Sequence, residues 1–125
     1  MIALSKEQIV LMHGRLIKRY GGIPGVRDEG LLDSAINAPN QSFEGHEFFP
    51  TVVDKAVRLC IGLVKNHPFY DGNKRIGALA LLTTLDLNKI ILRTNSTELS
   101  DTILKLAANS ISDELLLQWV KNRIE

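Results

Sequence analysis

Apolar residues recur at helical spacing along most of the chain, and the breaks in this pattern predict where helices begin and end. The first helix is expected after Ser5, which forms a capping box with Gln8, and before the glycine pair that starts at Gly21. A second, short helix is expected from a cap at or near Asp28 to Ile36. These signals predict two helices joined by a turn-rich linker.

The middle of the chain holds the two most apolar helical patterns. One starts with Pro50, which suits a first helical turn, and ends near His67, because the residue before a proline disfavours helical geometry. The other spans residues 76–85, is opened by Asn73 and its neighbours, and is apolar almost all round. Such a pattern is typical of a central helix that is surrounded by others.

The end of the chain predicts two further amphipathic helices. Residues 90–92 are interpreted as a short extended piece, and the helices that follow start near Ser96 or Thr97 and at Ser112. The whole pattern predicts an all-α protein, a compact bundle of about six helices in one domain over residues 1–125. A polar loop would open the buried central helix.

Residues 40–49 do not fit helical spacing. They contain Phe43, Phe48 and Phe49, and prolines flank them, so a loop or short hairpin carrying apolar side chains is expected. Two interpretations stay open for these rings. They plug the core, or they form a flap that lies over an active site or grips a partner.

Composition and charge narrow the function classes. With 15 basic and 14 acidic residues the net charge is +1, which gives no field that favours direct binding of nucleic acid. No apolar stretch reaches membrane-spanning length, so no membrane partner is expected, and the default compartment is the cytoplasm. The single Cys60 excludes an internal disulfide, and its apolar neighbours suggest a buried thiol.

A few single residues outside the loop at residues 67–75 belong to types that can bind ligands or metals, but structural roles are favoured for them. His13 lies within the first helix and is expected to be partly exposed, with no special role. Asp28 and Glu29 most simply complement the dipole of the second helix, with metal binding as a weaker alternative. Trp119 is expected to be a packing anchor rather than a binding platform.

The loop before the central helix carries the densest set of reactive groups. Gly72 lets the backbone turn so that successive amides point into one concavity, an anion nest. Asn73 opens the helix, where unpaired N–H groups and the positive dipole end attract anions. Lys74 and Arg75 add positive charge, and the planar fork of Arg75 suits phosphate oxygens. The second half of the loop therefore predicts a phosphate site.

The first half of the loop adds an acid–base group and a carboxylate. His67 is the natural general base because its ordinary pKa is about 6.5. Asp71 suits a magnesium ion that bridges phosphates, although it could instead form a solvated ion pair with Lys74 or Arg75. Phe69 is expected to pack inward. Together these groups predict phosphoryl or nucleotidyl transfer to a hydroxyl.

The run His67–Arg75, HPFYDGNKR, resembles the signature of the Fic/Doc (Fido) family, His-x-Phe-x-Asp/Glu-Gly/Ala-Asn-x-Arg. Arg19–Gly25 is also similar to the N-terminal part of the Doc branch, so the resemblance covers essentially the whole chain. The family implies a helical fold, and Fic members mostly transfer AMP from ATP to a hydroxyl on a target protein.

Two positions depart from the Fic pattern. Lys74 replaces a usual glycine, and Ala78 stands where many Fic enzymes have a second arginine. A lysine at the first position is characteristic of Doc-type toxins, which phosphorylate a threonine of elongation factor Tu and arrest translation. The resemblance thus implies a kinase in which ATP is turned so that its γ-phosphate faces the hydroxyl, with a protein adenylyltransferase as the alternative.

The resemblance also implies roles for individual residues, with Mg²⁺ and ATP as cofactor and phosphate donor. His67 would deprotonate the target threonine and Asp71 would hold magnesium. The anion hole and the phosphate contacts would come from Gly72, Asn73, Lys74 and Arg75. The aromatic stretch 43–49 falls where the family places a flap that positions the target.

Regulation is expected to come from a second protein. Fic proteins that restrain themselves carry an inhibitory Ser/Thr-x-x-x-Glu-Gly/Asn helix, and the chain has no such match, because Ser42–Gly45 has the wrong spacing. A Phd-like antitoxin, whose amphipathic helix occupies an apolar groove, is therefore the expected partner in a type II toxin–antitoxin system. A further alternative is an inactive module that only binds the antitoxin.

Overall fold

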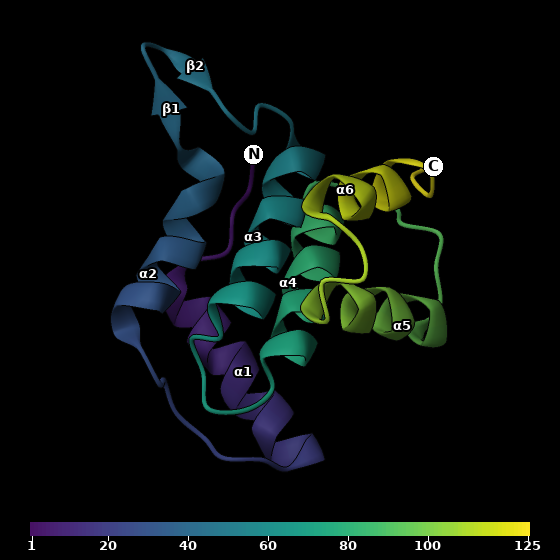
Figure 1. Cartoon of the computed structure of the whole chain (residues 1–125). Coiled ribbons are helices and arrows are strands. Elements are labelled where there is room, and N and C mark those ends of the chain that lie inside the picture. Colours follow the sequence, from purple (N-terminus) through teal and green to yellow (C-terminus); the bar gives the residue numbers. More distant parts are fainter.

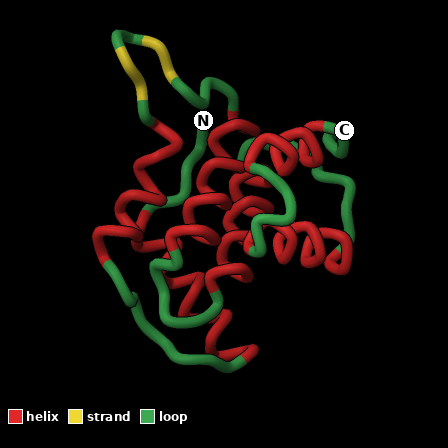
Figure 2. The backbone as a smooth tube through the Cα atoms, viewed as in Figure 1, coloured by secondary structure: helices red, strands yellow, loops and turns green.

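The computed structural model describes all 125 residues, and it confirms the predicted all-α class. Six α-helices make up the fold, and the only sheet is a hairpin of two short strands (Figures 1 and 2). The elements in chain order are α1 (Lys6–Tyr20), α2 (Glu29–Asn37), the 3-10 turn η1 (Ala38–Asn40), β1 (Ser42–Phe43), β2 (His46–Glu47), α3 (Val52–Asn66), α4 (Asn73–Leu87), α5 (Ser96–Ala107) and α6 (Asp113–Lys121).

Helices α3 and α4 lie side by side at the centre, with α1 and α2 on one side and α5 and α6 on the other (Figure 1). The apolar core accordingly has two clusters, one beneath α5 and α6 and one beneath α1 and α2. Gly77 of α4 allows the central pair to approach closely, because a Cβ there would lie 2.6 Å from Val64 Cγ2. Cys60 is buried between the two helices, as predicted.

Side-chain caps start most of the helices, because the first amides of a helix have no partner within it. Ser5 and Gln8 form the predicted capping box of α1. Asp28 caps α2, and its Oδ1 accepts from Leu31 N at 2.9 Å. The predicted start of α3 was wrong by two residues: Thr51 is the N-cap and the helix begins at Val52, so Pro50 lies before the cap instead of in the first turn.

The phenylalanine-bearing segment forms the expected hairpin, which projects from the bundle (Figure 1). Phe43 and Phe48 are 65% and 58% exposed, so these two rings do not plug the core. Only Phe49 is half-buried, and it lies under Arg58, whose guanidinium carbon is 5.8 Å from the ring centroid. The core-plug interpretation is therefore wrong for the hairpin itself.

Lys55 of α3 anchors the base of the hairpin, although its side chain is buried. Its ammonium donates to the carbonyl oxygens of Pro39 and Phe49 at 3.1 and 2.6 Å, and to the Glu47 carboxylate at 2.8 Å. Three acceptors match the three donors of an ammonium group. The buried charge is thus satisfied, and both ends of the hairpin are fixed to α3.

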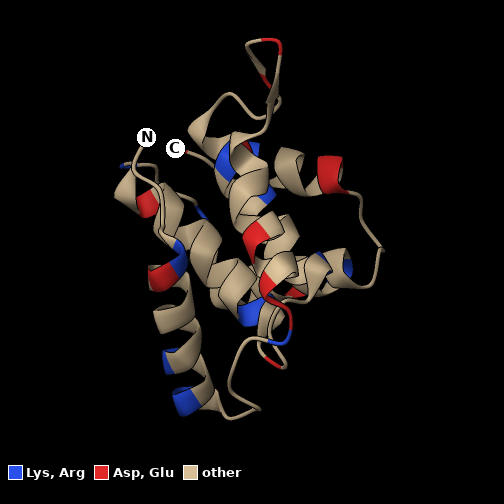
Figure 3. Ribbon diagram, turned by 90° about the vertical axis from the view of Figure 1, so that its left-hand side faces the viewer, with Lys and Arg blue, Asp and Glu red and all other residues tan.

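The remaining predictions concern the acidic pair at the start of α2, the distribution of charge and the absence of a membrane-spanning stretch. Glu29 pairs with Lys6 at 2.8 Å, and no group of three or more metal-binding side chains exists, so the weaker metal alternative for Asp28 and Glu29 finds no support. Basic and acidic residues are interspersed along the helices in Figure 3. None of the helices is long and apolar enough to span a membrane.

Two predictions for the last third of the chain are confirmed. Leu92 pairs with Ile124 in an isolated β-bridge, which agrees with the short extended piece expected at residues 90–92. Trp119 packs against the core, as expected of a packing anchor.

Candidate functional site

The loop between α3 and α4 turns on two residues with left-handed backbone geometry. His67 ends α3 with φ 54° and ψ 52°, as the proline after it predicted, and Gly72 caps α4 with φ 78°. The imidazole of His67 therefore projects from the end of one central helix. Lys74 and Arg75 project from the first turn of the other, and all three side chains are exposed.

Phe69 and Asn73 close the loop through a reciprocal pair of hydrogen bonds. Phe69 N donates to Asn73 Oδ1 at 2.9 Å, and Asn73 Nδ2 donates to the Phe69 carbonyl at 3.0 Å. Both side chains are buried, which confirms that Phe69 packs inward. Because the carboxamide is committed to the loop, the group that Asn73 offers to an anion is its backbone N–H.

The linker after α1 braces the loop from outside. Ile23 N donates to Asp71 Oδ2 at 2.6 Å, and Arg27 Nε donates to the His67 carbonyl at 2.8 Å. The backbone N–H of Arg27 also donates to the Pro68 carbonyl at 2.8 Å. Gly22 allows this close approach, because a Cβ there would lie 3.1 Å from Asp71 Cβ.

His13 is buried, 2% exposed, so the prediction of a partly exposed histidine without a role was wrong. Its Nε2 lies 2.7 Å from the Asp71 carbonyl oxygen, and its ring stacks on Phe69 with centroids 3.7 Å apart. A signal was present in the sequence: His13 follows Ile9 by four residues and precedes Ile17 by four, on the face of α1 that packs inward.

Helix α4 differs from the others in how it begins. Each of the other five α-helices has a side chain that caps its first turn, whereas α4 has none. The first helical hydrogen bond runs from Ile76 N to the Gly72 carbonyl, so the amides of residues 73–75 have no partner within the protein. The positive end of the helix dipole is thus open to an anion.

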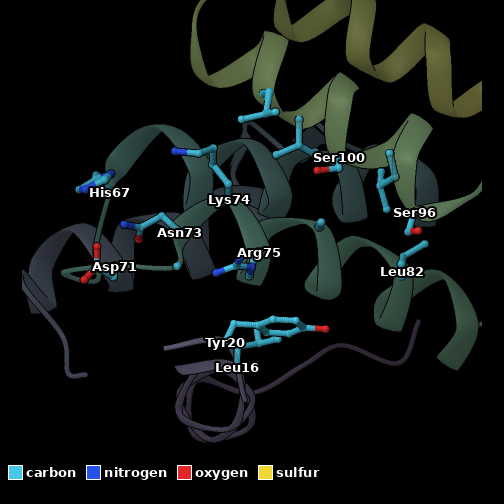
Figure 4. Close-up of a pocket in the computed structure, with 15 residues that line it drawn as sticks. Leu16, Tyr20, His67, Asp71, Asn73, Lys74, Arg75, Leu82, Ser96 and Ser100 are labelled. Carbon is cyan, nitrogen blue, oxygen red and sulfur yellow. The ribbon is translucent and has the colours of Figure 1, made fainter. Parts of the chain in front are cut away.

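A cavity of about 650 Å³ lies over this helix start and is bounded by α1, α4 and α5. All of the predicted site residues line it, namely His67, Asp71, Gly72, Asn73, Lys74 and Arg75. The close-up shows His67 and Asp71 near one another at one end, with the nitrogen ends of Lys74 and Arg75 directed toward that end (Figure 4). The polar groups that the sequence places in one loop therefore share one cavity.

Other lining residues were not predicted, because they come from distant helices. Tyr20 of α1 lies against Arg75, whose guanidinium carbon is 4.6 Å from the ring centroid, and the contact is visible in Figure 4. The far end of the cavity is mainly apolar, and it is lined by Leu82, Leu99, Ile103 and Leu104 together with the hydroxyl side chains of Ser96 and Ser100. The cavity thus combines a charged end with an apolar end.

Asp71 is the only carboxylate among the residues that line the cavity. Its Oδ2 accepts from Ile23 N, while its Oδ1 has no hydrogen-bond partner, and the carboxylate forms no ion pair with Lys74 or Arg75. Magnesium is commonly held by one or two carboxylates together with substrate phosphates. One free carboxylate oxygen beside an anion site fits that requirement, and the ion-pair alternative is not observed.

The fold and cavity define a helical protein with an anion-receptive helix start beside a histidine and a carboxylate. A family model described as Fic/DOC family matches residues 3–85, so the chain belongs to this family, as the motif indicated. The chain is 41% identical over 71 residues to Toxin Doc of Mycolicibacterium smegmatis, a match that covers 57% of the chain and about half, 55%, of that relative. It is 28% identical over 109 residues to Protein kinase doc of Escherichia phage P1, covering 87% of the chain and 85% of that protein.

Proposed function

We propose that the protein is the toxin of a type II toxin–antitoxin system that acts in the cytoplasm. In this proposal it transfers the γ-phosphate of ATP to a threonine of elongation factor Tu and so arrests translation. The observation that carries the proposal is the shared cavity, where a histidine and a carboxylate lie beside the uncapped start of α4. The names of the two relatives, a toxin and a protein kinase, support the same activity.

ATP would bind with its phosphates over the first turn of α4. The unpaired amides of residues 73–75 and the side chains of Lys74 and Arg75 supply donors and positive charge in one place. A cavity of about 650 Å³ lies within the range of small-molecule sites. The contact with Tyr20 restricts the guanidinium of Arg75, which reduces the entropy that phosphate binding must overcome.

His67 is suited to take the proton of the attacking hydroxyl. Its backbone is fixed by the bond from Arg27 to the His67 carbonyl, while its ring is exposed at the cavity. In the step proposed here, the threonine oxygen bonds to the γ-phosphorus, the bond to the β–γ bridging oxygen breaks, and the hydroxyl proton passes to the imidazole. ADP leaves, and the phosphate charge is balanced by Lys74 and Arg75.

Asp71 would hold magnesium through its free Oδ1, next to the proposed phosphate site. The ion would neutralise phosphate charge when bound. The hydrogen bond from Ile23 N to Oδ2 restrains the carboxylate, and Asp71 lines the cavity.

Two residues favour a kinase over an adenylyltransferase. Lys74 and Ala78 both line the cavity, and they stand where Fic enzymes have glycine and, in many cases, arginine. An extra cation at one position and a lost cation at the other would change which phosphate lies beside His67. AMP transfer to a target hydroxyl is the second candidate, because the same base and metal residues would serve it.

The apolar end of the cavity is the site that we propose for a Phd-like antitoxin. Leu82 and Leu104 are 37% and 50% exposed there, on α4 and α5 respectively. An amphipathic helix could place its apolar face against them and so cover the cavity. An inactive module that only binds the antitoxin would present the same groove, so activity must decide between the two.

The deciding experiment is label transfer to elongation factor Tu from ATP labelled at either the α- or the γ-phosphate. Transfer of the γ-label alone is expected, and it should be lost in His67→Ala while the circular dichroism spectrum is unchanged. Transfer of only the α-label would replace the kinase with an adenylyltransferase. Equal growth arrest by His67→Ala and the unsubstituted protein would contradict the role of His67 as base.

A further inference from the structure

His13 and the Asp71–Gly72 peptide form a contact that lies outside the family signature. The His13 side chain comes from α1 and is buried, and its Nε2 is 2.7 Å from the Asp71 carbonyl oxygen. A carbonyl oxygen only accepts, so Nε2 must carry the proton. Stacking on Phe69, with an angle of 12° between the ring planes, fixes the plane in which this N–H points.

The same peptide carries the Gly72 N–H. A trans peptide is planar, and its N–H and C=O point in opposite directions, so the bond from His13 to the carbonyl directs the Gly72 N–H away from α1. Gly72 has φ 78° and ψ 15°, and Asn73 after it is helical. A left-handed residue followed by a right-handed one turns three successive N–H groups into one concavity, here those of Gly72, Asn73 and Lys74.

We propose that His13 is a positioning residue that aims the Gly72 N–H into the phosphate site by holding the Asp71 carbonyl. The inference rests on the proposed function, since it assigns the concavity to the phosphates of ATP. The Gly72 N–H has no acceptor within the protein, as expected for a donor kept for a ligand. Gly72 also packs against α1, because a Cβ on it would be in van der Waals contact with Ile17 Cδ1 at 3.4 Å and His13 Nε2 at 3.5 Å.

Two substitutions separate the hydrogen bond from the packing. His13→Phe keeps an aromatic ring over Phe69 but removes the donor. His13→Gln keeps an N–H at about the reach of Nε2 but removes the ring. The control is Leu11→Ala, which alters an exposed side chain of the same helix without touching the loop.

Binding of MgATP, measured by calorimetry, and the rate of phosphoryl transfer to elongation factor Tu are the readouts. His13→Phe is expected to bind MgATP about 10-fold more weakly and to have a kcat reduced about 10- to 100-fold, because the Gly72 N–H no longer points at the phosphates. His13→Gln is expected to stay within about threefold of the unsubstituted protein in both. Retained function in His13→Phe, or equal loss in both variants, would overturn the proposal.

The tautomer of His13 tests the proposal without any substitution. Nitrogen chemical shifts of the imidazole should show Nε2 protonated, and a bare Nε2 would exclude the bond even if a variant fails to fold. If the unsubstituted protein binds MgATP but transfers neither label, the proposed function fails while the binding data still decide the role of His13. Absence of MgATP binding would overturn both.

Discussion

Replacing Asn73 with alanine tests whether the most buried polar residue of the loop acts through structure. The substitution removes both hydrogen bonds to Phe69 and leaves a buried N–H and a buried carbonyl without partners. Each unpaired group costs about 1–3 kcal/mol, so the direct sum is about 2–6 kcal/mol. Because the neighbouring cavity can admit water to part of the loop, a loss near the lower half of that range, about 3 kcal/mol, is expected.

The assay is urea unfolding followed by circular dichroism, with a thermal scan alongside. A loss of about 3 kcal/mol should lower the Tm by roughly 10 °C in a chain of this size. Lys74→Ala is the matched control, since Lys74 is exposed on the same helical turn. Its unfolding free energy should change by no more than about 0.5 kcal/mol, whereas its phosphoryl transfer should fall sharply. Unchanged stability in Asn73→Ala would refute the loop-closing role and favour direct contact of the carboxamide with substrate.

Three further predictions concern the scaffold. Gly62→Ala should cost about 1–2 kcal/mol, because its Cβ would lie 2.9 Å from a side chain of α2, whereas Gly14→Ala, with nothing within 4 Å, should stabilise by about 0.5–1 kcal/mol; equal effects in urea unfolding would contradict the packing argument. Lys55→Met should make the hairpin at residues 42–47 a preferred site of limited proteolysis, unlike Lys65→Met on the exposed face of the same helix, and identical digestion patterns would count against the anchor. Burial raises the pKa of the Cys60 thiol from 9.0 to about 12, so the folded protein holds this proton more tightly than the unfolded chain does. The stability that the protonated thiol contributes is therefore complete below pH 9 and is lost as the pH rises from 9 to 12. The unsubstituted protein should therefore lose about 1.4 kcal/mol per pH unit more than Cys60→Ala over that window, and parallel curves in pH-dependent unfolding would exclude this.

The features that the sequence predicted are those whose partners are close in the chain. The capping box of Ser5 needs only the next helical turn, and the end of α3 at His67 follows from the proline beside it. The six candidate site residues line one cavity because they all lie in one loop, so local spacing already brings them together. Such features depend on short-range backbone geometry, which a single sequence records directly.

The features that the sequence did not predict depend on contacts between distant segments. The burial of His13 depends on a loop that lies 58 residues away, and its sequence neighbours do not reveal that partner. The exposure of Phe43 and Phe48 likewise depends on how the hairpin is held, which is decided by Lys55 of α3. Aromatic rings are more often buried than exposed, so exposed rings on a projecting hairpin depart from the default expectation.

The loop divides its tasks between backbone and side chains. The carbonyls of His67, Pro68 and Asp71 accept hydrogen bonds from α1 and from the linker at residues 21–28, and the backbone of Phe69 is bonded to Asn73. Since the backbone is fixed by these contacts, the exposed side chains of His67 and Lys74 at the cavity are left free of structural hydrogen bonds. Substitutions of the exposed groups should therefore affect chemistry with little loss of stability, whereas substitutions of the buried residues should displace the loop itself. The precision of the site thus depends on residues outside the signature as much as on the signature.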